Sequence, residues 1–260
     1  MDQLLTSSQT GHIALLTLND PSRYNALSLQ MIENLIDALT RIAGQDDIRV
    51  VILAAQGKAF SAGHDLRQMV EGTEADDGAD RMRHLFDRCA TLMQLITALP
   101  QPVIAQVQGI ATAAGCQLVA SCDMAVAADT ARFGVNGVSL GLFCATPMVA
   151  LTRAIPPKAA FEMLTTGDFI SAARARELGL INRVATPDDL QAATMQLADS
   201  VAAKLPAAIR LGKAAFHRQM NQPLDMAYQG AGQTMCDNVM LPDTIEGMRA
   251  FLEKRPPDWG

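Results

Sequence analysis

Aromatic and charged residues are both scarce in this chain of 260 residues. Aromatic residues make up 4% and charged residues 18%, whereas apolar residues reach 49%. The formal net charge is -6, and the lysines and arginines are scattered, so the sequence offers no basic stripe for nucleic acid and no basic patch for a membrane. This composition predicts a compact protein with extensive helix packing that acts on small molecules.

The sequence also lacks metal-ligand spacing among its cysteines and lacks long apolar runs. No stretch of about 18 apolar residues predicts a membrane span, and the polar start of the chain does not resemble a signal peptide. The cysteines are odd in number, so we expect no metal site and a set of reduced, buried thiols, which favours a cytoplasmic protein. These cysteines are Cys89, Cys116, Cys122, Cys144 and Cys236.

Hydrophobic patterning predicts an α/β fold. Strand-like and helical patterns alternate over the first two thirds of the chain. Strands are expected over residues 12–18, 50–54, 103–107 and 123–127, and helices after Ser28, over 81–99 and around 115–120. The segment 71–80 carries five acids and two glycines, which indicates a mobile surface loop and a candidate lid.

The last third of the sequence is almost wholly helical in pattern. We expect an α/β core over residues 1–200 and a helical region over 201–260, which is too short for a core of its own and should pack on the core or on a neighbouring subunit. Ser171 and Gly179 are expected to cap one helix. Further helices should begin near Asp188, Pro206, Pro223 and Pro242.

Two segments of small residues, 59–66 and 109–118, carry the chemical signal. Each follows an apolar run and opens into an expected helix, so its backbone N–H groups should point outward. Two such turns brought together could hold one carbonyl oxygen between two amide donors, which is how enzymes stabilise an enolate or a tetrahedral oxyanion.

These and three other segments resemble the crotonase, or enoyl-CoA hydratase/isomerase, superfamily from near one end of the chain to the other. The matching segments are 18–27, 60–66, 109–123, 133–141 and 250–255. The sequences of residues 61–66 and 141–144 are most similar to those of the enoyl-CoA hydratase domain-containing proteins, a subgroup that lacks both catalytic glutamates.

The resemblance implies a ClpP-like core of repeated ββα units, a helical C-terminal trimerisation region, and a homotrimer or homohexamer. It implies an acyl-CoA ligand, with coenzyme A part of the substrate and no separate cofactor. By position, the N–H groups of His64 and Ala114 would bind the thioester oxygen. The CoA moiety would meet main chain from Ala62 through Asp65 to Leu66, Arg23 and Tyr24 near the nucleotide, and Phe251 and Lys254 of a neighbouring subunit.

The sequence departs from the hydratase pattern at two positions. Family hydratases carry glutamates where this chain has Gln117 and Gly137, and adding water to a conjugated thioester needs an acid and a base. We therefore expect an acyl-CoA-binding enzyme that stabilises an oxyanion or enolate, with slow hydration. Alternatives are an isomerase, a thioester hydrolase or an acyl-CoA binder without catalysis. A positive φ at Gly137 would further disfavour a glutamate there.

Several side chains keep two interpretations. His64 is either a general base or only a backbone donor, and Asp65 either caps a helix or takes part in chemistry. Gln117 either positions a ligand or satisfies polar neighbours. Cys116 and Cys144 are either nucleophiles or packed thiols. The remaining polar candidates near the expected pocket are His84, Asn136 and Thr146.

Overall fold

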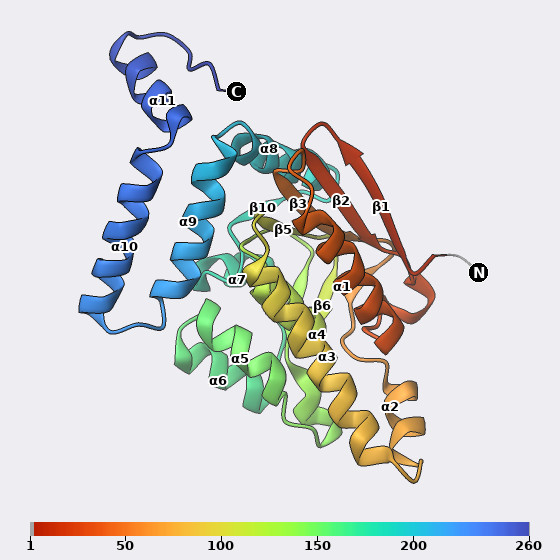
Figure 1. The fold of residues 1–260 in the computed structure, drawn as a ribbon. Coiled ribbons are helices and arrows are strands. Elements are labelled where there is room, and N and C mark those ends of the chain that lie inside the picture. Colours follow the sequence, from red (N-terminus) through yellow and green to blue (C-terminus); the bar gives the residue numbers. More distant parts are fainter. Residues whose placement is uncertain (1–2, 260) are drawn as a thin grey trace.

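The computed structural model describes residues 3–259, and its centre is a sheet of six strands (Figure 1). The spatial order is β1-β2-β3-β5-β7-β10, in which β1 and β2 are antiparallel and every other neighbouring pair is parallel. The strands are β1 (Leu5–Thr10), β2 (Ile13–Leu18), β3 (Val50–Ala55), β5 (Val103–Val107), β7 (Met124–Ala128) and β10 (Arg183–Ala185).

Alternate residues of these strands face two different layers of helices. Val51 and Leu53 belong to the cluster that includes residues of α1 (Leu29–Ala43) and α3 (Gly78–Ala98), whereas Val50 and Ile52 pack with residues of α8 (Leu190–Ala202). Because both faces of the sheet are covered, the central strands β3, β5 and β7 are apolar at every position except Gln106, which is why the sequence shows nearly continuous apolar runs there.

A second, smaller sheet places the ends of three strands side by side. Its order is β4-β6-β8-β9, and β4, β6 and β8 are parallel. Each follows a strand of the large sheet and leads into a helix, which produces the repeated ββα units of the crotonase fold. The strands are β4 (Ala59–Ser61), β6 (Ile110–Thr112), β8 (Arg132–Gly134) and β9 (Ile170–Ser171).

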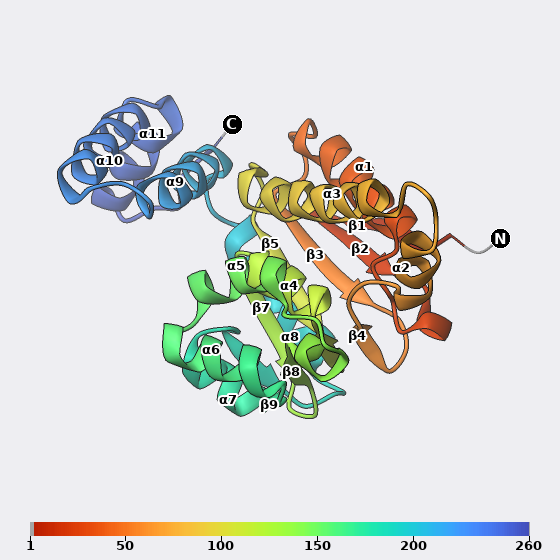
Figure 2. The same cartoon turned by 90° about the horizontal axis from the view of Figure 1, so that it is seen from below.

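The helices that follow these strands start at one edge of the small sheet. They are α2 (Leu66–Thr73) after β4, α4 (Ala114–Ser121) after β6, and the 3-10 helix η2 (Asn136–Leu140) after β8. The carboxyl ends of parallel strands meet at the same edge, so the three turns lie together. Next along the chain come α5 (Ala145–Ala154), α6 (Pro157–Thr166) and α7 (Ala172–Leu178), of which α6 and α7 lie to the left of β8 in Figure 2.

Three predicted helix starts are confirmed by side-chain hydrogen bonds. The hydroxyl of Ser28 accepts from the N–H of Met31, and the hydroxyl of Ser171 accepts from the N–H of Arg174. The carboxylate of Asp65 accepts from two N–H groups in the first turn of α2, so this residue caps a helix. Each side chain satisfies a donor that the helix cannot pair internally.

The last three helices stand apart from the sheets and form what we call the helical arm, residues 206–252. The arm consists of α9 (Pro206–Gln219), α10 (Leu224–Val239) and α11 (Pro242–Leu252), and both views show it beside the α/β core rather than over it (Figures 1 and 2). These starts agree with the predicted ones. The division of the chain at residue 200 remains a prediction.

One buried lysine on α9 fastens the arm to the core. Lys213 is 8% exposed, and its Nζ donates to the carboxylate of Asp123 at 2.6 Å, to the carbonyl of Ile96 at 2.9 Å and to that of Gln101 at 3.0 Å. His217, one turn further along α9, lies 3.0 Å from the other oxygen of Asp123. The cation is therefore fully coordinated at the junction of the two regions.

Some expectations about local structure are wrong. Residues 71–80 are not one mobile loop: α2 runs through Thr73 and α3 begins at Gly78. Gly72 packs against Met82, where a Cβ would lie 2.5 Å from the methionine methyl group, so tertiary packing orders this acidic segment. The stretch after Ala159 is also interrupted by strands β9 and β10. Within the described residues, no helix is long and apolar enough to cross a membrane.

Candidate functional site

The two small-residue turns are packed directly against each other. A Cβ added to Gly63 would lie 2.9 Å from the Cβ of Ala113 and 3.2 Å from the backbone nitrogen of Ala114. A Cβ added to Gly115 would lie 2.3 Å from the carbonyl oxygen of Ser61. Glycine is therefore required at both positions for the turns to approach this closely.

The backbone N–H of His64 points away from the neighbouring loop. The carbonyl of Gly63 accepts from the N–H of Leu27 at 2.7 Å. In a trans peptide the N–H points opposite to the carbonyl of the preceding residue, so the N–H of His64 is directed to the other side. It makes no hydrogen bond to the described part of the chain.

The N–H of Ala114 is directed outward by a strained residue. Ala113 has φ 49° and ψ -122°, a conformation that residues other than glycine rarely adopt. Its carbonyl accepts from the N–H of Gln117 at 3.0 Å, so the N–H of Ala114 points out of the start of α4. Ala114 is fully buried, and between residues 3 and 259 its N–H has no hydrogen-bond acceptor.

Gln117 lies one turn into α4 with a buried and unpaired side-chain oxygen. The residue is 4% exposed, and its Oε1 has no partner in the described structure. An amide carries no proton that titrates near neutral pH. The side chain can therefore orient a polar ligand, but it cannot exchange a proton with one.

Gly137, in η2, has no room for a side chain. An added Cβ would lie 2.6 Å from the carbonyl oxygen of Leu142 and 2.7 Å from the Sγ of Cys144. The expectation of a positive φ at this glycine is wrong, because its φ lies outside that region. The constraint here comes from the chain that returns over η2 and occupies the space a larger residue would need.

The thiols beside these turns are packed and unreactive. Burial raises the pKa of Cys116 to about 12 and raises the pKa of Cys144, so neither is a thiolate at neutral pH. Packing is therefore the better interpretation of both residues. The expectation that all the cysteines are buried is wrong for Cys236, which is exposed on α10, and for Cys122, which is half-buried.

The segment expected near the nucleotide is held by ion pairs. Arg23 lies 2.8 Å from the carboxylate of Asp20 and 3.2 Å from that of Asp65, and its side chain is 47% exposed. Tyr24 is exposed and adopts φ 54°. Leu66 is exposed at the start of α2, and Ala62 is exposed at the turn. These residues form an accessible rim beside the paired turns.

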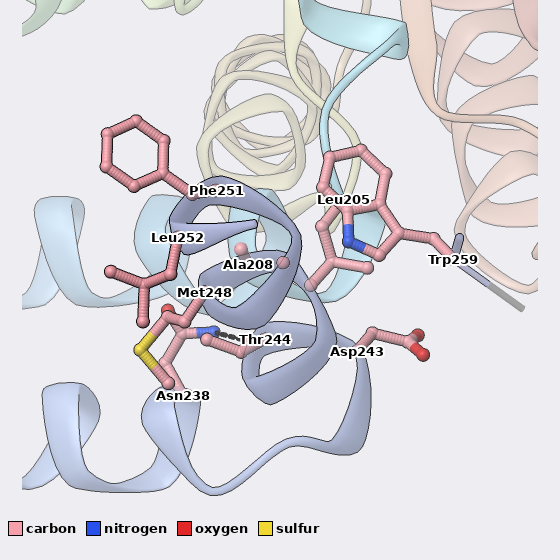
Figure 3. Close-up of a pocket in the computed structure, with 10 residues that line it drawn as sticks. Leu205, Ala208, Asn238, Asp243, Thr244, Met248, Phe251, Leu252 and Trp259 are labelled. Carbon is pink, nitrogen blue, oxygen red and sulfur yellow. Dashed lines mark hydrogen bonds between the residues drawn. The ribbon is translucent and has the colours of Figure 1, made fainter. Parts of the chain in front are cut away.

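The structure does not bring Phe251 and Lys254 to the paired turns. Both lie at the end of α11, where Phe251 is 83% exposed. Phe251 instead lines an open apolar pocket of about 550 Å³ that is formed mainly by helices of the arm, together with Leu205 and Trp259 (Figure 3). Within one chain these two residues are remote from the site, so a role there needs a second subunit.

The other predicted polar candidates lie around the site with different surroundings. The hydroxyl of Thr112 donates to the side-chain oxygen of Asn136 at 2.6 Å, which ties η2 to the end of β6. His84 is exposed on α3, and Thr146 is half-buried on α5. Among the described residues, no group of three or more His, Cys, Asp or Glu side chains could hold a metal ion.

Sequence reasoning missed the partner of the His64 side chain. The ring of Phe86 on α3 meets the imidazole edge-on, with ring centroids 5.5 Å apart and planes at 73°. Phe86 belongs to the apolar stripe of an amphipathic helix and looks like any other core residue of that stripe. Only the fold brings it to residue 64.

Comparison with known proteins identifies close relatives of the whole chain. Residues 8–260 match the family model described as enoyl-CoA hydratase/isomerase. A mitochondrial protein of Danio rerio named enoyl-CoA hydratase domain-containing protein 3 is 46% identical over 98% of this chain and 87% of its own length. Its counterpart in Mus musculus is 44% identical over 99% of this chain and 84% of its own length.

Solved structures agree with the same assignment. An enoyl-CoA hydratase from Mycobacterium smegmatis superposes with a TM-score of 0.96 at 49% identity, covering 99% of both chains. The human enoyl-CoA hydratase domain-containing protein 3 superposes with a TM-score of 0.94 at 43% identity, covering 99% of this chain and 100% of its own.

Proposed function

This chain belongs to the enoyl-CoA hydratase/isomerase family, and we propose that it binds an acyl-CoA thioester and stabilises the thioester oxygen with the N–H groups of His64 and Ala114. The observation that carries the proposal is the pair of N–H groups, on two turns that touch, for which residues 3–259 supply no acceptor. One of the two belongs to a fully buried residue, and a buried donor without an acceptor is rare in a folded protein.

Such a pair would act on the chemistry of a thioester. Removing a proton from the carbon next to the carbonyl moves negative charge onto the carbonyl oxygen, and attack on the carbonyl carbon does the same. Donors that are already in place stabilise that charge without reorganising, and removing one such donor typically costs about 10²- to 10³-fold in rate. The strain at Ala113 supports this role, because strained backbone is concentrated at functional sites.

The same arrangement disfavours efficient hydration. Gln117 has no titratable proton, and the space beside Gly137 is filled by Leu142 and Cys144. General acid and base groups each contribute about 10²- to 10⁴-fold, so an enzyme without both would hydrate slowly. An isomerase or a thioester hydrolase would use the same oxygen site with other groups. A protein that only binds acyl-CoA would need no acid or base group.

We also propose that the chain assembles as a homotrimer or homohexamer. The arm exposes several large apolar side chains, among them Leu224 and Tyr228 on α10, and a surface of this kind usually marks a protein interface. Assembly would allow Phe251 and Lys254 to approach the CoA of a neighbouring subunit. A cytoplasmic location remains a prediction, and the Danio rerio and Mus musculus relatives are named as mitochondrial proteins.

Hydration of crotonyl-CoA tests the proposed chemistry. We expect the wild-type chain to bind crotonyl-CoA but to hydrate it far more slowly than the tens of turnovers per second of an ordinary enzyme. Gln117→Glu should raise the rate, because it adds a titratable carboxyl at a buried position of α4. Gly137→Glu should not, because its Cβ would collide with the carbonyl of Leu142. Wild-type turnover at the ordinary rate would contradict the proposal.

A further inference from the structure

The two ring nitrogens of His64 have different hydrogen-bonding roles. Nδ1 lies 3.1 Å from the carbonyl oxygen of Leu27. A carbonyl oxygen only accepts, so Nδ1 must carry the hydrogen, and Nε2 of the neutral ring is left with its lone pair. The contact with Leu27 therefore fixes the tautomer.

Nε2 is buried and unused within the folded chain. Between residues 3 and 259 no donor reaches it. Leaving a buried acceptor without a donor is unfavourable, so such atoms call for an explanation. The half-buried ring of Phe86 covers the imidazole edge-on, and no charged side chain bonds to either ring nitrogen. Movement of the Phe86 side chain would open Nε2 to a ligand.

The other polar side chains of the paired turns are non-basic or already accept hydrogen bonds. Gln117 is an amide, and the thiols of Cys116 and Cys144 are held protonated by burial. The carboxylate of Asp65 already accepts from the first turn of α2 and from Arg23. His64 is thus the basic group of these turns that carries a free lone pair.

We propose that Nε2 of His64 accepts the α-proton of the bound acyl-CoA. This inference rests on the proposed function, because the same residue would offer its backbone N–H to the thioester oxygen. In the step, the bond between the α-carbon and its hydrogen breaks and the proton passes to Nε2. The electron pair moves into the thioester, and the resulting enolate oxygen is held by the N–H groups of His64 and Ala114.

The protonated imidazole then returns its proton. Return to the α-carbon regenerates the starting thioester and exchanges its hydrogen with solvent. With a thioester that carries a double bond between its β- and γ-carbons, return to the γ-carbon shifts the double bond into conjugation with the carbonyl. The site would therefore act as an acyl-CoA isomerase without a glutamate, and exchange at the α-carbon is its simplest signature.

Exchange in deuterated water measures this step without requiring a net reaction. Butyryl-CoA is incubated with the full chain, and loss of the α-hydrogen signal is followed by proton NMR. In parallel, calorimetry gives the affinity for butyryl-CoA. His64→Asn keeps a short side chain that can donate to Leu27 and removes Nε2, whereas His64→Gln places an amide near the position of Nε2. His12→Asn is the matched control, because Nδ1 of the exposed His12 also lies 2.8 Å from a backbone carbonyl.

We expect the wild type and His12→Asn to exchange equally. Both variants of His64 should exchange at least about 100-fold more slowly, with affinity for butyryl-CoA within about threefold of wild type. Undiminished exchange in His64→Asn, or in a folded His64→Gln should the first variant fail to fold, would overturn the assignment of the base. Binding without wild-type exchange would also overturn it and leave the proposed binding site intact. A wild type that binds no butyryl-CoA would instead contradict the proposed function.

Discussion

The α/β core and the helical arm use similar apolar residues in opposite ways. In the core, the large apolar side chains of α1 are buried against the sheet, and Met31, Ile32 and Leu35 are each 0% exposed. In the arm, side chains of the same kind face outward: Leu224 is 75% exposed and Met235 is 67% exposed. Large apolar side chains are therefore buried on α1 of the core and exposed on α10 of the arm.

This difference supports the proposal that the arm contacts other subunits. Removing apolar surface from water is worth about 25 cal/mol per Å², and the arm forgoes this gain on most of its α10 surface. Polar contacts join α9 of the arm to the core: Lys213 contacts Asp123 and two backbone carbonyls, and Arg210 lies 2.6 Å from the carboxylate of Asp46. The core is therefore stabilised by apolar packing, whereas a buried cation and a surface ion pair contribute to the attachment of the arm.

The largest expected effect is loss of assembly when the arm's surface is charged. The double substitution Leu224→Glu with Tyr228→Glu places two acids one helical turn apart on α10, where they would be desolvated in a subunit interface. Light scattering should give a trimer or hexamer for the wild type and for the control Gln229→Glu, and a monomer for the double variant. A wild type that is monomeric at micromolar concentration would contradict the interpretation of the arm.

Removing the buried cation should separate the arm from the core. Lys213→Met removes the cation that faces the carboxylate of Asp123 and leaves that oxygen only the N–H of Val103, and breaking a buried ion pair by removing one partner typically costs about 3–5 kcal/mol. The free energy of unfolding from urea titration should fall by that amount, while Lys204→Met at an exposed position should change little. If the two substitutions cost the same, the attachment of the arm does not depend on this contact.

A methyl group between the two turns tests the close packing of the core site. Gly115→Ala adds a Cβ that meets the carbonyl of Ser61 at 2.3 Å, and overpacking of this kind costs about 1–3 kcal/mol. Gly212→Ala, in a helix of the arm with open space around it, should instead gain about 0.5–1 kcal/mol. Melting temperatures compare the two. Equal shifts would mean that the turns are not held in contact.

Acid should affect the two regions in different pH windows. Burial lowers the pKa of His64 from its ordinary 6.5, so the stability linked to its neutral ring is present above pH 6.5 and is lost as pH falls through the lower folded value. In the arm, Arg255 lowers the pKa of Glu246 to about 2, so that ion pair is lost only as pH falls from 4.5 toward 2. Unfolding of His64→Asn and of Glu246→Gln across pH measures each contribution. Each substitution should reduce the pH dependence of the free energy of unfolding only in the pH range where its own residue titrates.

The sequence predicted those parts of the fold that depend on local chemistry. Ser28, Asp65 and Ser171 cap helices because a short polar side chain satisfies a nearby N–H, and such a signal spans only three residues. Strands β2, β3, β5 and β7 of the large sheet were also predicted, from their apolar runs. The two edge strands β1 and β10 were not predicted: β1 is polar and carries no apolar pattern, and β10 has only three residues.

Features that depend on distant residues could not be read from the sequence. Lys213 and Asp123 are 90 positions apart, and nothing local marks either as a buried partner of the other. The crowding of Gly137 arises from Leu142 and Cys144, which return over η2 only in the fold. Likewise, the unpaired Nε2 of His64 is visible only once Leu27 and Phe86 are placed around the ring.

The central claim is that two backbone N–H groups bind the oxygen of a CoA thioester. Calorimetry with butyryl-CoA and with its thioether analogue, in which a methylene replaces the carbonyl, isolates that oxygen while keeping the rest of the ligand. We expect the thioester to bind about 5- to 150-fold more tightly, since two hydrogen bonds are worth roughly 1–3 kcal/mol together. Gly115→Ala should reduce this difference, because it forces the two turns apart. Equal affinity of the wild type for the thioester and the thioether would contradict the claim.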